Sequence, residues 1–106
     1  MPKGREETAR AFYSGALGLR EVAKPAELAG RGGLWFEAEG IALHLGVEDP
    51  FVPVRKAHPA FCVTDLDVAR QALADHDPTD ISALPGLRRF YIADPFGNRI
   101  EIVAPT

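Results

Sequence analysis

The segment at residues 88–103 constrains the fold of this chain more than any other stretch. Residues 88–93 are rich in β-branched and aromatic side chains, and residues 99–103 alternate polar and apolar side chains with a period of two. Residues 94–98 combine a proline, a glycine and two side chains that can bond nearby backbone groups. The sequence therefore predicts two antiparallel strands joined by a short turn.

Glu101 lies in the middle of the second of these strands, between Ile100 and Ile102. Since successive side chains of a strand point to opposite faces, Glu101 faces away from the two isoleucines. A carboxylate there must be hydrated, paired, or bound to a cation. Arg89 and Arg99 are near enough in sequence to pair with it, so a structural ion pair and a place in a binding cleft are both open.

Composition limits the classes of protein to which the chain can belong. Of its 106 residues, 46% are hydrophobic and 25% are charged, which is usual for one soluble domain with its own core. The net charge is -3, and scattered lysines and arginines give no sign of a nucleic-acid surface. The single cysteine, Cys62, excludes an internal disulfide and is expected to be an inert buried thiol. We therefore expect a cytoplasmic protein without nucleic-acid or membrane partners.

The first half of the chain predicts a helix, a short strand and a hairpin. Residues 5–17 place apolar side chains three and four positions apart, as in an amphipathic helix, and Gly18 is a natural stop. Gly15 inside this helix indicates close packing at that point. A short extended stretch at residues 19–24 precedes a loop, and residues 33–39 and 41–47 form a hairpin around Gly40.

The second half repeats this order with one additional strand. Residues 57–63 form a strand whose Pro59 cannot donate to a ladder, which predicts a sheet edge or junction. A capping pattern at residues 64–67 opens a helix to about His76, and a short strand within residues 77–84 leads to the turn at Pro85. Residues 1–106 thus form one α+β domain of two βαβββ modules, at about 5–47 and 57–103. The first strand of module one is absent.

Four short phrases and this order of elements match a known family. The phrases are AFY at residues 11–13, LGL at 17–19, AHPA at 57–60 and DPFGNRIE at 94–101. In these features the chain resembles the vicinal oxygen chelate superfamily, which includes glyoxalase I, fosfomycin-resistance enzymes, extradiol dioxygenases and bleomycin-resistance proteins. The resemblance covers the chain from residue 5 onward, and it implies curved sheets that enclose a cleft with a helix outside each.

Members that hold a metal take ligands from the first and last strands of each module. By this resemblance His58 and Glu101 occupy the ligand positions of module two, and both suit a divalent cation such as Zn, Ni, Mn or Fe. The matching position in the first hairpin is Ala42, which cannot ligate, and the fourth position belongs to the absent strand. His44, two residues beyond Ala42 on the same face, is a candidate substitute. A start site chosen too far downstream would explain the absent strand, which in the longer protein would supply a further ligand.

Two functions compete under this resemblance, and a third possibility is a degenerate member that acts as an interaction module. The first is a metalloenzyme of the glyoxalase or dioxygenase type (a lyase, isomerase or dioxygenase). There a cation on His58 and Glu101 acts as Lewis acid on vicinal oxygens of a substrate, and Glu101 is catalytic. The second is a metal-free protein of the bleomycin-resistance type that sequesters a small molecule.

Either function needs residues along a cleft, and each of these also has a structural interpretation. The expected cleft residues are Trp35, Ala42, Arg89, Tyr91 and Arg99. Trp35 and Tyr91 are otherwise core residues, His44 and His58 packing residues, and Arg88 with Arg89 either a solvated pair or an anchor for an anion. The strand edge exposed by the absent strand predicts a homodimer.

Overall fold

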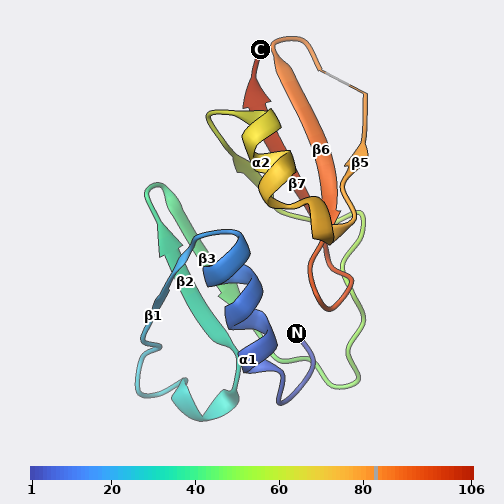
Figure 1. The fold of residues 1–106 in the computed structure, drawn as a ribbon. Helices are drawn as coiled ribbons and strands as arrows, with labels where there is room; N and C mark the ends of the chain where they lie inside the picture. The colour runs from blue at the N-terminus through green and yellow to red at the C-terminus, as the bar shows by residue number, and fades with distance from the viewer. Residues whose placement is uncertain (83) are drawn as a thin grey trace. The chain divides into compact units, whose positions relative to one another are not determined.

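The computed structural model describes residues 1–82 and 84–106, which form two compact units, Met1–Val52 and Pro53–Thr106 (Figure 1). Each unit contains helical segments and one β-sheet, so the chain has a mixed α/β fold with two sheets. Within the described residues, no helix has the length and apolar character needed to cross a bilayer. The two-module description and the absent first strand stay predictions.

The first unit contains three helical segments and three strands. In chain order they are α1 (Glu6–Arg10), the π-helix η1 (Ala11–Ala16), β1 (Arg20–Val22), the 3-10 helix η2 (Ala29–Arg31), β2 (Leu34–Ala38) and β3 (Ile41–Leu45). The strands form an antiparallel sheet in the order β1-β2-β3. Phe36 of β2 is fully buried, and its ring lies 5.5 Å from that of Tyr13. The predicted hairpin around Gly40 is confirmed, and Gly40 has the positive φ (74°) that such a turn requires.

The helix predicted at residues 5–17 is present but not uniform. Its second half is a π-helix, in which the Leu17 N–H donates to the Phe12 carbonyl oxygen five residues earlier, at 2.9 Å. Phe12 and Tyr13 face the core, whereas Gly15 is exposed, and an added Cβ there would meet no atom within 4 Å. The expectation of close packing at Gly15 is therefore wrong, because this glycine lies on the solvent side of the helix.

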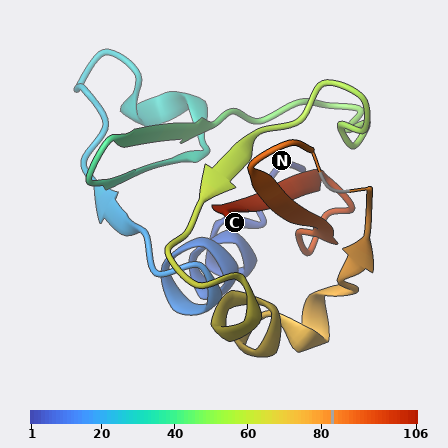
Figure 2. The same ribbon diagram turned by 90° about the horizontal axis from the view of Figure 1, so that it is seen from above.

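The second unit has a four-stranded sheet covered on one face by a helix. Its elements are β4 (Ala60–Cys62), α2 (Leu66–Ala72), the 3-10 helix η3 (Ala74–His76), β5 (Thr79–Asp80), β6 (Leu87–Ala93) and β7 (Arg99–Pro105). The strand order is β4-β7-β6-β5, with β4 parallel to β7 and the other pairs antiparallel. Figure 2, seen from above, shows α2 on one side of β6 and β7. The helix covers the face on which Phe90, Ile92, Ile100 and Ile102 are buried.

Most sequence expectations for this unit are confirmed, with two differences. The predicted hairpin is β6–β7, and β4 lies at the sheet edge as Pro59 indicates. β4 is shorter than the predicted residues 57–63, because Pro59 has no N–H to pair. Cys62 is exposed rather than buried, because its register with Val103 places it on the same face of the sheet as Glu101, opposite the buried face. Of the range 77–84, which contains β5, residue 83 lies outside the described residues.

Candidate functional site

The turn between β6 and β7 is held by a buried carboxylate. Asp94, 4% exposed, accepts backbone hydrogen bonds at Oδ1 from Phe96 (2.9 Å) and Asn98 (2.8 Å). Its Oδ2 accepts a third from Nδ2 of Asn98, also at 2.8 Å. These bonds fix the side chain of Asn98, which is itself only 8% exposed. The turn is therefore a rigid support at one end of the sheet.

This turn positions the segment that precedes β4. The Val54 N–H donates to Oδ1 of Asn98, and the Val54 carbonyl accepts from the Arg99 N–H, both at 2.9 Å. Gly97 has φ of +86°, and a Cβ there would lie 3.6 Å from the ring of Pro53. The start of the segment is thus fixed to the turn on two sides. The segment continues to His58, which it brings to the exposed face of the sheet.

His58 and Glu101 lie next to each other on the face of the sheet opposite α2. Nε2 of His58 is 3.1 Å from Oε1 of Glu101, and the two side chains are only 14% and 13% exposed. Nδ1 of His58 is 2.7 Å from the carbonyl oxygen of Arg55. Both ring nitrogens therefore face oxygen atoms.

The hydrogen-bond chemistry of this pair calls for either a proton or a metal ion between its two facing atoms. The carbonyl oxygen of Arg55 can only accept, so Nδ1 of His58 carries a proton. In the neutral ring Nε2 then presents its lone pair to the Glu101 carboxylate, which also only accepts. The contact is favourable with a proton on Nε2 or with a metal ion between the two atoms. Metal-binding histidines usually donate their other N–H to a carbonyl or carboxylate, as His58 does here. The pair therefore fits two ligands of one cation.

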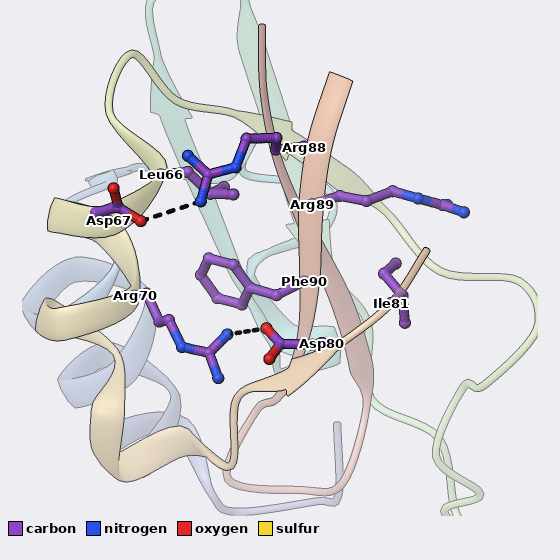
Figure 3. A pocket seen from close by; sticks show the side chains of 8 residues that line it. All are labelled: Leu66, Asp67, Arg70, Asp80, Ile81, Arg88, Arg89 and Phe90. Carbon is purple, nitrogen blue, oxygen red and sulfur yellow. Dashed lines mark hydrogen bonds and ion pairs between the residues drawn. The ribbon is translucent and has the colours of Figure 1, made fainter. Parts of the chain in front are cut away.

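Arg89 holds the other oxygen of Glu101. Its Nη1 lies 3.3 Å from Oε2, its Nε donates to the Ser82 carbonyl at 3.1 Å, and its side chain is 20% exposed. Figure 3 shows Arg89 leaving β6 on the side opposite to Arg88 and Phe90. The ion pair that the sequence left open between two arginines is thus made by Arg89.

Tyr91 and Arg99 continue this face beside the pair. Tyr91 lies opposite Glu101 in the β6–β7 ladder, and its ring meets that of His58 edge to face at 5.2 Å. Cζ of Arg99 lies 4.6 Å from the centroid of the Tyr91 ring, a cation–π contact. A cavity of about 140 Å³ opens at these residues, and Arg55 also lines it. Four candidate residues of this unit are therefore linked: His58 and Arg89 both contact Glu101, and Tyr91 contacts His58. Arg99 lies next to Tyr91.

The other three candidates belong to the first unit. Trp35 and His44 are neighbours across β2 and β3, and their rings stack 3.6 Å apart and 3° from parallel. They line a cavity of about 240 Å³ that Lys24 and Arg31 also border. Ala42 is exposed on β3 opposite Glu37. Across the described residues no group of three or more His, Cys, Asp or Glu side chains is arranged to hold a metal, and the ligand role of His44 stays a prediction.

Arg55 is the site residue that the sequence analysis missed. Its carbonyl sets the proton position of His58, and Arg55 is one of the residues that line the cavity next to Tyr91. A backbone carbonyl leaves no signature in a sequence. The available signal was its position three residues before His58, a separation at which a tight turn can bring a backbone carbonyl to the histidine ring.

Comparison with known proteins supports the resemblance. No protein-family model and no curated protein matches the sequence. Among solved structures, a glyoxalase family protein from Bacillus anthracis is 45% identical, with a TM-score of 0.94, over 100% of this chain and 88% of that one. A glyoxalase/dioxygenase from Nostoc punctiforme is 25% identical, with a TM-score of 0.76, over 95% of this chain and 84% of that one.

A more distant match shares the fold. The fosfomycin resistance protein FosX from Listeria monocytogenes is 16% identical, with a TM-score of 0.74, over 100% of this chain and 87% of that one. The Bacillus anthracis protein is similar enough in sequence, at 45% identity, to show a shared family as well as a shared fold. The chain therefore belongs to the vicinal oxygen chelate superfamily of glyoxalases, bleomycin-resistance proteins and dioxygenases.

Proposed function

We propose that the chain is a small-molecule metalloenzyme of the glyoxalase or dioxygenase type, with His58 and Glu101 as ligands of a divalent cation. The observation that carries this proposal is the contact between Nε2 of His58 and Oε1 of Glu101, two atoms that both present lone pairs once Nδ1 is engaged. When bound, such a cation supplies Lewis-acid chemistry to a ligand with vicinal oxygens. Zn, Ni, Mn and Fe all accept imidazole and carboxylate.

The chain's own residues would orient this pair. The Arg55 carbonyl holds the His58 ring with Nε2 toward the site, which fixes its tautomer. Arg89, anchored on the Ser82 carbonyl, holds Glu101 by one oxygen and leaves the other for the cation. The catalytic role that we propose for Glu101 is to hold the cation through this second oxygen. With Tyr91 and Arg99, Arg89 would also border the substrate.

A metal-free binding protein of the bleomycin-resistance type is the second candidate. The observation in its favour is the ion pair from Arg89 to Glu101, which together with a protonated His58 satisfies the carboxylate without a metal. In that case the stacked Trp35 and His44 of the first unit, with Ala42 beside them, would be a wall for a ligand.

The setting of this function is also proposed. A small molecule is the proposed partner, in the cytoplasm, and a homodimer the proposed assembly. Strand β3 pairs with β2 on one side and has no second strand neighbour among the described residues, which leaves an edge for another chain.

Titration with divalent metals tests the proposed centre. Calorimetry with Zn²⁺, Ni²⁺ and Mn²⁺ is expected to give saturable binding to the wild-type chain, weakened about a hundredfold or more by His58→Gln or Glu101→Gln, since each removes one ligand. His76→Gln and Asp80→Asn are matched controls, because Asp80 is also an arginine-paired carboxylate. Both controls should bind as the wild type does.

Two outcomes would count against the metal centre. Equal affinity in the wild type and in both site variants would remove His58 and Glu101 from the ligand set. A wild-type chain that binds none of these metals would favour the metal-free candidate. A loss on His44→Ala equal to that on His58→Gln would instead add His44 as a ligand.

A further inference from the structure

The arginines of the second unit fall into two groups. This unit contains five, Arg55, Arg70, Arg88, Arg89 and Arg99. Three of them form ion pairs with carboxylates: Arg70 with Asp80, Arg88 with Asp67 and Arg89 with Glu101. Arg55 and Arg99 have no carboxylate oxygen within 4.0 Å among the described residues.

The two unpaired arginines line the same cavity. This cavity of about 140 Å³ lies over the β5, β6 and β7 end of the sheet, beside the turn that holds Gly97. Among the described residues that line it, Asp77 is the one acidic residue, and Thr79 is a hydroxyl-bearing one. The lining therefore carries two arginines and one aspartate, a local excess of positive charge. Guanidinium groups in a concave, partly desolvated place bind anionic oxygens, often through two parallel hydrogen bonds.

The cavity is joined to the proposed metal ligands through two residues. Tyr91 contacts the Arg99 guanidinium on one side and the His58 ring on the other. Arg55 lines the cavity and holds the His58 ring with its carbonyl oxygen. A ligand in this cavity therefore lies next to the His58–Glu101 pair.

We propose that this cavity binds an anionic oxygen group, a carboxylate or a phosphate monoester, of the protein's small-molecule ligand. This proposal rests on the proposed function, which supplies the remainder of the ligand. The volume of the cavity is below the roughly 300–1,000 Å³ of a complete ligand pocket, so the cavity suits a headgroup. Arg55 and Arg99 supply the charge, Thr79 a hydroxyl and Tyr91 an aromatic wall.

A second cavity, beside α2, has arginines that already form ion pairs with carboxylates. It measures about 190 Å³ and is lined by three arginines, Arg70, Arg88 and Arg89, the last of which is paired with Glu101 (Figure 3). Figure 3 shows the guanidinium of Arg70 turned toward Asp80 and that of Arg88 turned toward Asp67. An anion in this second cavity would have to displace Asp80 or Asp67 from its arginine, so we expect no anion to bind there. Arg88 therefore serves as the matched control.

Calorimetric titration of the full-length chain with phenyl phosphate, benzoate and the neutral benzamide tests the anion site. We expect saturable binding of at least one anion and none of benzamide. Arg99→Gln and Arg55→Gln should each weaken it about tenfold, the value of one charge-assisted hydrogen bond. Arg88→Gln should bind as the wild type does. Arg55 is exposed in a loop, so its variant keeps the test valid if Arg99→Gln fails to fold. The anion that binds more tightly identifies the headgroup.

Three results would overturn the anion site: no saturable anion binding by the wild type, equal binding of benzamide, or an equal loss on Arg88→Gln. Divalent-metal affinity of the same variants separates this proposal from the proposed function. Anion binding that depends on Arg55 and Arg99 in a chain that binds no metal supports the anion site and rejects the metal centre. Metal binding without anion binding supports the metal centre and rejects the anion site.

Discussion

Replacing Asp94 with alanine is expected to lower the free energy of unfolding by about 3 kcal/mol, because buried donors lose their acceptor. Asp94 is 4% exposed and accepts from the N–H groups of Phe96 and Asn98 and from the Asn98 side chain. Asp94→Asn keeps a carbonyl oxygen for the two backbone donors and should cost about 1 kcal/mol. Chemical denaturation followed by circular dichroism measures both changes.

Asp80→Ala is the control for this series. The Asp80 side chain is 82% exposed and pairs only at the surface with Arg70, so its loss should change stability by less than about 1 kcal/mol. An Asp94→Ala variant as stable as Asp80→Ala would show that the turn is not the rigid support described above. Because Asn98 and Arg99 hold Val54, Asp94→Ala should also loosen the segment that leads to His58.

Replacing Phe90 with alanine is expected to lower the free energy of unfolding by about 4 kcal/mol. Phe90 is 1% exposed, on the face of β6 that α2 covers, and the Arg70 guanidinium lies 5.5 Å from its ring. Alanine leaves a cavity between helix and sheet, and Phe90→Leu should lose less, about 1.5 kcal/mol. The same denaturation experiment measures both.

Val68→Ala provides the comparison within the covering helix. Val68 is 62% exposed on α2, and its truncation should change stability by about 0.5 kcal/mol or less. A Phe90→Ala variant that lost no more than this would place the core of the second unit elsewhere than between α2 and the sheet.

Local features of the fold could be predicted from the sequence. The β6–β7 hairpin follows from alternation and turn chemistry within residues 88–103, and the edge position of β4 follows from Pro59. The role of Gly15 could not be predicted, because a glycine in a helix indicates either close packing or an exposed irregular turn. The structure has the second, a π-helix.

The contacts of the candidate site depend on side-chain directions that a sequence does not contain. Arg89 and Arg99 are both two positions from the Glu101–Tyr91 pair in the β6–β7 ladder, so register alone gives them equal access to Glu101. Arg89 bonds Ser82 as well as Glu101, whereas Arg99 lies on the Tyr91 ring. The contact between Arg55 and His58 was missed because it involves a backbone carbonyl.

The ¹⁵N spectrum of the imidazole nitrogens tests the central claim, that Nε2 of His58 faces Glu101 to share a cation. The chain has three histidines, and the signals lost in His58→Gln assign this ring. On addition of Zn²⁺ we expect Nε2 of His58 to move to the range of metal-bound nitrogen, while Nδ1 stays protonated on the Arg55 carbonyl. Both His58 nitrogens unchanged at saturating Zn²⁺, or a metal on Nδ1, would contradict the claim.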